Sequence, residues 1–193
     1  MQVLKKEIQN NIIESAKNLF INLGFEKTSM ERISLQAGIS KSNLYNYYKS
    51  KDELFDTLTD FAAYQFEKLI DFISNNEFTP KFGEAGFEKM LTDNLCKLIN
   101  ENKDGLILLM LCASGTKHEG LRTRFVQKIA NKFKRDYSKY FCANDPIVDV
   151  ITDNFFVGIT NLTLHSATEN DLYQNLSRFI RYHSKGFFEL VSS

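Results

Sequence analysis

The sequence contains few residues that interrupt helices, and it has no net charge. Among its 193 residues are two prolines, nine glycines and no tryptophan, while 24 lysines and arginines balance 24 aspartates and glutamates. So few breaks favour long helices. Apolar residues make up 43% and charged residues 25%, as in ordinary soluble globular proteins, and the length allows one or two domains with a substantial core.

Segments that would direct the chain to a membrane are missing. The first residues lack a basic segment followed by an apolar stretch, so we expect no signal peptide. The apolar run from Leu106 to Ala113 is too short to span a bilayer, and we expect it to form a buried helix in the middle of the C-terminal body. Cys96, Cys112 and Cys142 have neither CxxC nor metal-ligand spacing, which predicts reduced thiols, a cytoplasmic protein and no membrane partner.

Motifs for catalysis and metal binding are missing as well. His118, His165 and His183 lie far apart in sequence, and none has a carboxylate or cysteine at metal-ligand spacing. The chain has no glycine-rich phosphate loop, no nucleophile elbow and no signature of paired carboxylates. We therefore expect no enzyme, no cofactor and no metal.

The balanced charge conceals an asymmetry along the chain. Residues 1–51 carry eight lysines or arginines against four acidic residues, so the remainder is acidic by the same margin. A basic N-terminal part on an acidic body suits a protein that touches DNA with one end. The excess is modest, so we expect weak nonspecific binding and a need for a dimer.

The chain is organised around residues 26–50, EKTSMERISLQAGISKSNLYNYYKS. Thr28 and Glu31 have the spacing of a capping box, which predicts a helix that begins near Ser29. Gly38 is suited to the left-handed position that ends this helix, and Ser40 is suited to cap the next one. Apolar residues meet in one small core: Ile33, Ala37, Ile39 and Leu44. The pattern predicts a helix-turn-helix, with an ordinary corner between two helices as the alternative.

The second of these helices is polar and rich in tyrosine, as DNA-reading helices are. Lys41 can donate to guanine or phosphate, while Ser42 and Asn43 can read base edges. Ser50 and Glu53 form a second capping box, which puts Lys51 at a helix N-terminus suited to phosphate. The predicted DNA contacts are Thr28, Ser29, Ser40, Lys41, Ser42, Asn43, Tyr45, Asn46, Tyr47 and Lys51.

This stretch resembles the N-terminal signature of the TetR-type bacterial transcriptional regulators. The resemblance covers about a quarter of the chain, and it departs at Ser34, where alanine is usual, and at Ser42, where glycine is common. The matching positions are Phe25, Thr28, Ile33, Ala37, Gly38, Ile39, Ser40, Leu44, Tyr45, Tyr47, Tyr48, Lys51, Leu54 and Phe55.

The resemblance implies an all-α homodimer with a DNA-binding domain and a second domain that binds a small molecule and releases DNA. We expect a three-helix helix-turn-helix domain over residues 1–50, and a helical effector-binding and dimerisation domain over residues 51–193. Apolar stripes predict about nine helices in all, and they begin near residues 5, 29, 41, 51, 87, 106, 121, 146 and 172. The helix from residue 51 to 74 leaves the N-terminal domain and is the expected mechanical link.

Aromatic residues of the body support two further hypotheses. A pocket lined by Phe61, Tyr64, Phe87, Phe125 and Phe155 could hold a flat or lipophilic effector, although such stripes can also be plain core. The last two helices carry more apolar residues than one inward face needs, and Phe156, Val157 and Phe188 are expected to point elsewhere. The resemblance implies a four-helix dimer interface there, for which we predict Phe156, Ile159, Phe179, His183 and Phe187.

The function predicted is a DNA-binding transcriptional repressor that is released by an effector. The alternative is a helix-turn-helix protein without an effector that acts through a protein partner; a helical enzyme would need a polar constellation that the sequence lacks. One feature stays open, a basic stripe that is either a solvated face or a site for an acidic ligand: Arg124, Lys128, Lys132, Arg135 and Lys139.

Overall fold

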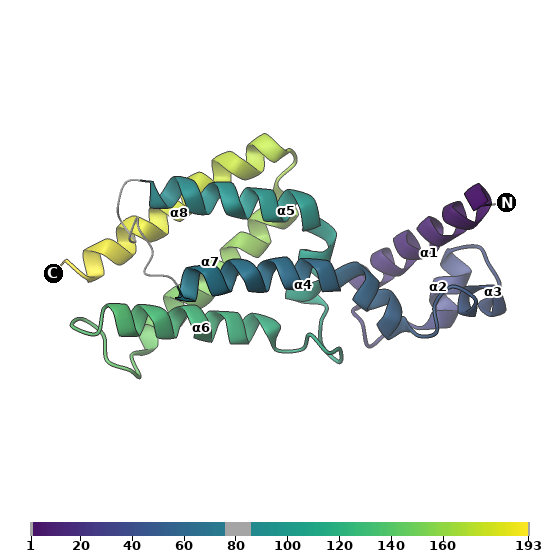
Figure 1. The fold of residues 1–193 in the computed structure, drawn as a ribbon, viewed down its shortest axis with the longest axis horizontal. Helices are drawn as coiled ribbons and strands as arrows, with labels where there is room; N and C mark the ends of the chain where they lie inside the picture. Colours follow the sequence, from purple (N-terminus) through teal and green to yellow (C-terminus); the bar gives the residue numbers. More distant parts are fainter. Residues whose placement is uncertain (1, 76–85, 193) are drawn as a thin grey trace. The chain divides into compact units, whose positions relative to one another are not determined.

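The computed structural model describes residues 2–75 and 86–192, and these residues form helices without any strand. Their backbone divides into two compact units. The head unit comprises Met1–Ala63 and Asp104–Leu121, and the body unit comprises Tyr64–Lys103 and Arg122–Ser193. The all-α class is thus confirmed. The eight helices of the described residues are coloured along the chain in Figure 1.

The head unit is built on α1 (Gln2–Leu23), α2 (Met30–Gln36) and α3 (Lys41–Tyr45). Gly24, at a φ of +80°, follows the last residue of α1, and Phe25 folds back so that its ring stacks on Phe20 with 5.7 Å between centroids. Side chains of α1 reach the following helices: Asn11 Nδ2 donates to the Ala37 carbonyl at 2.8 Å. The predicted three-helix arrangement is therefore present.

The head core also takes in parts of two longer helices. Leu54 and Phe55 belong to α4 (Lys51–Asn75), Leu108 belongs to α5 (Phe87–Leu111) and Cys112 directly follows α5, and all four are buried with the core residues of α1 to α3. The placement of the apolar run 106–113 in the middle of the body was therefore wrong. The sequence predicts that this run is buried, but a continuous apolar segment does not show which core it packs into.

A kink explains why eight helices stand where about nine were predicted. Asn102, inside α5, has φ −139° and ψ 23°, and its side-chain amide donates to the Leu98 carbonyl at 3.0 Å. The predicted break near this point is thus a bend within one helix. Beyond it Gly105 lies so close to α4 that an added Cβ would stand 2.7 Å from the Leu58 carbonyl oxygen.

The body unit contains the rest of α4 and α5 together with α6 (Leu121–Asp136), α7 (Pro146–His165) and α8 (Glu169–Leu190). Asp145 caps α7, which has Pro146 in its first turn and begins where a helix was predicted. Gly158 lets α7 approach α8, because a Cβ there would meet the Phe179 ring at 2.0 Å. The space that Gly158 leaves is therefore occupied by a side chain of the same protomer.

Candidate DNA-binding surface and ligand cavity

The first helix of the helix-turn-helix is capped one residue later than the sequence suggested. Ser29, not Thr28, is the N-cap of α2, and its Oγ accepts from the Arg32 N–H at 3.3 Å. The Thr28 hydroxyl instead donates to the Gly24 carbonyl at 2.8 Å, and the residue is buried. The Thr28–Glu31 capping box was therefore wrong, because two adjacent hydroxyl residues offered alternative caps. Thr28 has its side chain turned into the head rather than toward a partner.

The turn and the second helix follow the prediction closely. Gly38 has a φ of +66°, and the Ser40 Oγ accepts from the Asn43 N–H at 3.1 Å at the start of α3. Leu44 anchors α3 in the core with no exposed surface, and Ile39 packs partly buried against the same core. The short helix is therefore held at its first turn and by its apolar side, which leaves its polar side free.

Six of the ten predicted DNA contacts are exposed, and five of these lie on α3 or directly beside it. Asn43 and Tyr47 are half-buried, and the Ser40 hydroxyl is used as a cap. Tyr45 is 46% exposed, a high value for an aromatic side chain in a folded unit. The exposed predicted contacts are Ser29, Ser40, Lys41, Ser42, Tyr45 and Asn46.

Lys51 occupies a different environment from the one predicted. Its ammonium donates to the carbonyl oxygens of Phe25 at 2.9 Å and Thr28 at 3.2 Å, and it lies 4.1 Å from the centroid of the Phe25 ring. Ser50 caps α4 as predicted, but the Glu53 carboxylate accepts from the Lys49 N–H at 2.6 Å rather than closing the box on Ser50. Lys51 thus ties α4 to the loop between α1 and α2.

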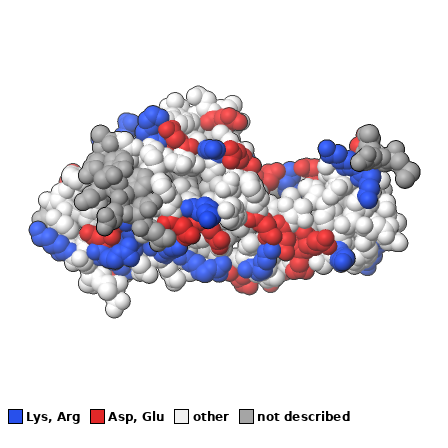
Figure 2. All heavy atoms as spheres, viewed as in Figure 1, with Lys and Arg blue, Asp and Glu red and all other residues white. Residues whose placement is uncertain are grey.

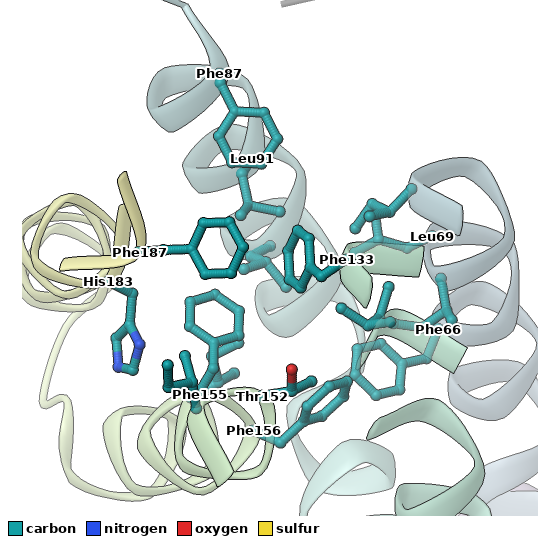
Figure 3. Close-up of a pocket in the computed structure, with 16 residues that line it drawn as sticks. Phe66, Leu69, Phe87, Leu91, Phe133, Thr152, Phe155, Phe156, His183 and Phe187 are labelled. Atoms are coloured by element: carbon teal, nitrogen blue, oxygen red, sulfur yellow. The ribbon is translucent and has the colours of Figure 1, made fainter. Parts of the chain in front are cut away.

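The body unit contains a cavity between its helices, drawn in Figure 3. In that view His183 projects from α8 on one side, and Phe66 and Leu69 come from α4 on the other. The unfilled space amounts to about 70 Å³. The lining residues are Phe66, Leu69, Ile70, Ile73, Phe87, Leu91, Leu95, Ile129, Phe133, Ile151, Thr152, Phe155, Phe156, Ile159, His183 and Phe187.

The structure brings together only some of the five residues predicted for a pocket. Phe87 and Phe155 line the cavity, and Phe125 packs edge-to-face on the lining residue Phe66 at 5.0 Å. Phe61 and Tyr64 do not line it; their side chains are 62% and 55% exposed. The α4 residues that do line it follow a 66, 69, 70, 73 spacing, and this helical stripe was the available signal.

The residues predicted for the dimer interface lie mostly inside the protomer. Phe156 and Phe187 are 5% and 3% exposed and line the cavity, so the expectation that Phe156 points elsewhere was wrong. Ile159 and His183 also line the cavity, and Phe179 stacks on Phe155 with 5.5 Å between centroids. Val157 and Phe188, expected to point elsewhere, are exposed.

An apolar face of α7 remains on the surface of the protomer. Its members are spaced three or seven residues apart, on one side of the helix: Ile147, Val150, Val157 and Leu164. Among the described residues α7 is the one helix long and apolar enough to cross a membrane by length and composition, and 28% of its most apolar window is buried. These four side chains therefore form an apolar face that no described residue of the protomer covers fully.

The basic stripe of α6 is largely paired within the body unit. Lys128 bonds to Asp71, Lys132 to Asp136 at 2.5 Å, and Arg135 to the Ser74 carbonyl at 3.5 Å. Along the lower edge of Figure 2, where α6 lies, blue and red side chains alternate. This pattern favours the interpretation as a solvated face over that of a site for an acidic ligand.

A small polar cluster in the head unit was not foreseen from the sequence. Lys117 Nζ lies 3.0 Å from an Asp56 oxygen and 2.8 Å from an Asp60 oxygen, and His118 Nε2 lies 2.9 Å from Asp60. Burial raises the pKa of the Asp60 carboxyl, but its hydrogen bonds to Lys117 and His118 outweigh this and leave the pKa lowered. The carboxylates stand one helical turn apart on α4, so the cluster ties the loop after α5 to that helix.

The described residues thus form an all-helical protein that has a helix-turn-helix in its head unit and an apolar cavity in its body unit. Residues 12–58 match the family model described as bacterial regulatory proteins, tetR family. In the part of the chain that holds the helix-turn-helix, residues 12–58 are thus similar to the TetR family.

Parts of the chain also align with individual curated relatives. The HTH-type transcriptional regulator YuxN of Bacillus subtilis (strain 168) is 33% identical over 99 residues, 51% of this chain and 33% of the relative. The nucleoid occlusion factor SlmA of Pasteurella multocida (strain Pm70) is 30% identical over 77 residues, 39% of each chain. The alignments thus span less than half the length of these curated relatives.

A solved structure shares the fold over most of the chain. A TetR-family member from Streptomyces coelicolor A3 has a TM-score of 0.59 at 21% identity and covers 88% of both chains. At this identity the likeness establishes the fold, which is that of the TetR regulators.

Proposed function

We propose that this protein is a cytoplasmic transcriptional repressor that binds a palindromic operator as a homodimer and is released by a small lipophilic or aromatic effector. The observation that carries the proposal is the exposed polar side of α3, on a helix capped by Ser40 and anchored by Leu44. Helices of this kind place their first residues against base edges in the major groove. Lys41 and Ser42 stand at those positions and are exposed.

Dimerisation is supported by the uncovered face of α7. Val150 is 53% exposed and Val157 is 39% exposed, and an isologous contact between two copies of this face would bury both. A two-fold dimer presents two copies of α3, which suits half-sites roughly 34–36 Å apart or at a multiple of that distance. The interface proposed here uses Ile147, Val150, Val157 and Leu164 in place of the buried Phe156 and Phe187.

Effector control is supported by the cavity and by the helices that line it. Phe66 and Leu69 of α4 line the cavity, while Leu54 and Phe55 of the same helix lie in the head core. A ligand that favours one arrangement of α4 and an operator that favours another would weaken each other through a coupling free energy. The effect is reciprocal, so the operator would also weaken the effector.

A second candidate is a DNA-binding protein without an effector, acting through a protein partner. Two observations favour it. The cavity holds about 70 Å³ of unfilled space, far below the roughly 300–1,000 Å³ of ordinary ligand pockets. Part of the chain, 77 residues, also aligns with a relative whose name is nucleoid occlusion factor rather than transcriptional regulator.

The experiment that tests the proposal is selection of bound sequences from random duplex DNA with the purified full-length protein. Enrichment of a palindrome would support the repressor and supply a probe for effectors. If the folded protein enriches no sequence, operator binding is refuted. An enriched operator whose affinity no compound of a lipophilic library changes would favour the second candidate.

A matched pair of variants tests the role of α3 itself. Asn43→Ala is expected to change the enriched bases, because amides read base edges. Tyr47→Phe is expected to weaken binding to all sequences alike, because its hydroxyl is predicted to contact phosphate. If Asn43→Ala enriches the same palindrome with the same base preferences, Asn43 does not read the operator.

A further inference from the structure

Among the described residues, those that line the cavity of the body unit carry no charged side chain. Its sixteen lining side chains include no aspartate, glutamate, lysine or arginine. An ionised group brought among them would lose its hydration and meet no opposite charge, which is strongly unfavourable. A ligand charged at the end that enters the cavity is therefore rejected by the wall itself.

The two polar side chains of the wall do not alter this. The Thr152 hydroxyl donates to the Val148 carbonyl at 2.7 Å, so its hydrogen is already used. His183 packs edge-on to Phe155 and Phe179, with centroids 5.2 and 4.4 Å apart, and burial lowers the pKa of its imidazole. The ring is thus neutral at neutral pH.

The size and composition of the wall favour one aromatic ring. Six phenylalanines line the cavity, and aromatic rings attract one another in offset and edge-to-face arrangements. The unfilled space of about 70 Å³ is smaller than the cavity of about 150 Å³ that accepts benzene in another protein. The recess between the lining side chains amounts to about 680 Å³ when the part open to solvent is included, so a single ring gains room by shifting the side chains toward it.

We propose that this cavity binds an uncharged monocyclic aromatic compound and rejects the same ring when it carries a carboxylate or an ammonium group. The inference rests on the effector part of the proposed function and narrows the effector to a compound whose buried end is neutral. In this proposal the cavity distinguishes neutral from charged ligands because its lining side chains carry no charge, not because one side chain recognises the ligand.

Four compounds with the same ring and one attached carbon test the proposal: toluene, benzyl alcohol, benzoate and benzylammonium. Binding to the full-length protein is measured by titration calorimetry, and by the rise in melting temperature that a ligand of the folded state produces. Toluene is expected to bind saturably. Benzyl alcohol should bind about tenfold more weakly, because its hydroxyl gives up its hydration when it is buried in a mostly apolar wall. The two ions should give no saturable signal at the same concentrations.

Two variants separate the cavity from the surface. Ile151→Phe adds volume inside the cavity, whereas Leu190→Phe adds volume at an exposed position of α8. Toluene binding should be lost in the first and kept in the second. Phe155→Leu, which enlarges the cavity, keeps the test decisive if Ile151→Phe fails to fold: 1-methylnaphthalene should bind this variant more tightly than the original protein.

The outcomes distinguish this inference from the proposed function. Benzoate or benzylammonium binding as tightly as toluene, or toluene binding unchanged in folded Ile151→Phe, would overturn the neutral-ring proposal. Toluene that binds without changing operator affinity would leave the ligand class standing and refute the effector role. Benzoate that binds and releases the operator would support an effector and overturn the class assigned here.

Discussion

The contacts of Lys51 in the structure differ from the contact that its place in the sequence predicts. Its position predicts a phosphate contact, yet its ammonium donates to the carbonyl oxygens of Phe25, Glu26 and Thr28 at 2.9, 3.4 and 3.2 Å. The same group lies 4.1 Å from the centroid of the Phe25 ring. Lys51→Met removes the charge and the three donors but keeps most of the apolar stem.

The expected loss of stability follows from these contacts. A hydrogen bond that involves a charged group contributes about 1.5–3 kcal/mol where it is buried, and here the three acceptors share one partly exposed ammonium. A cation over an aromatic face adds about 0.5–1 kcal/mol at exposed sites. We therefore expect Lys51→Met to lower the free energy of unfolding by about 2 kcal/mol. For a chain of this length that corresponds to a drop in melting temperature of about 4–8 °C.

The assay is thermal unfolding followed by circular dichroism, with Lys41→Met as the matched control. Lys41 is exposed on α3, and no described residue bonds its ammonium. Lys41→Met should melt with the original protein and reduce the salt dependence of DNA binding by about one unit of slope.

The opposite pattern would refute the structural role of Lys51. If Lys51→Met melts within about 1 °C of the original protein while its salt slope for DNA falls by about one, Lys51 binds phosphate and the internal contacts contribute little. If both stability and salt slope fall, Lys51 serves both roles.

Three further predictions concern other parts of the chain. Gly105→Ala should destabilise the folded protein by about 1–2 kcal/mol, because the added methyl group meets the Leu58 carbonyl oxygen at 2.7 Å. Gly186→Ala, whose added methyl group meets nothing within 4 Å, should stabilise the protein by up to about 1 kcal/mol. Equal melting temperatures of the two variants would contradict the close packing at Gly105. Burial lowers the pKa of His183, so the unfolded chain binds a proton at higher pH than the folded chain does. The free energy of unfolding should therefore fall as the pH drops below 6.5, the ordinary pKa of histidine. In denaturation measured at several pH values, His183→Leu should make this fall smaller. Val157→Glu on the exposed face of α7 should convert a dimer to monomers in sedimentation analysis, while Asn131→Glu on the exposed side of α6 should not; a dimer that persists in Val157→Glu would rule out this face.

Local signals allowed most of the head to be predicted. Gly38 and Ser40 act as the sequence indicates because a left-handed turn and an N-cap depend on the residue itself and its immediate neighbours. The one-residue error at Thr28 and Ser29 arose where two neighbours offered the same hydroxyl. The assignment of Lys51 stays a prediction as regards DNA, since a lysine at a helix N-terminus looks the same in sequence whether it meets phosphate or carbonyl oxygens.

The body was less predictable because its errors concern partners rather than helices. The stripe on α7 revealed that Phe156 and Val157 are apolar, but adjacent residues on a helix point about 100° apart, so only one of them faces the core. Phe156 lies inside and Val157 outside. Likewise Phe61 and Tyr64 were predicted to line the pocket because they are aromatic. The residues of α4 that line the cavity begin at Phe66, two residues after Tyr64.

Continuity of the helices decides which of them is suited to carry a signal from the cavity to the head core. Both α4 and α5 contribute residues to the cavity and to the head core. Between these two sets α5 bends at Asn102, whose backbone leaves the helical conformation. A bend of this kind absorbs a small displacement of the residues before it, since φ and ψ at one position change more easily than a hydrogen-bonded helix stretches. No such break interrupts α4. We therefore expect a ligand beside Phe66 and Leu69 to act on the helix-turn-helix through α4. We expect α5 to transmit less of the displacement, because its bend absorbs part of it.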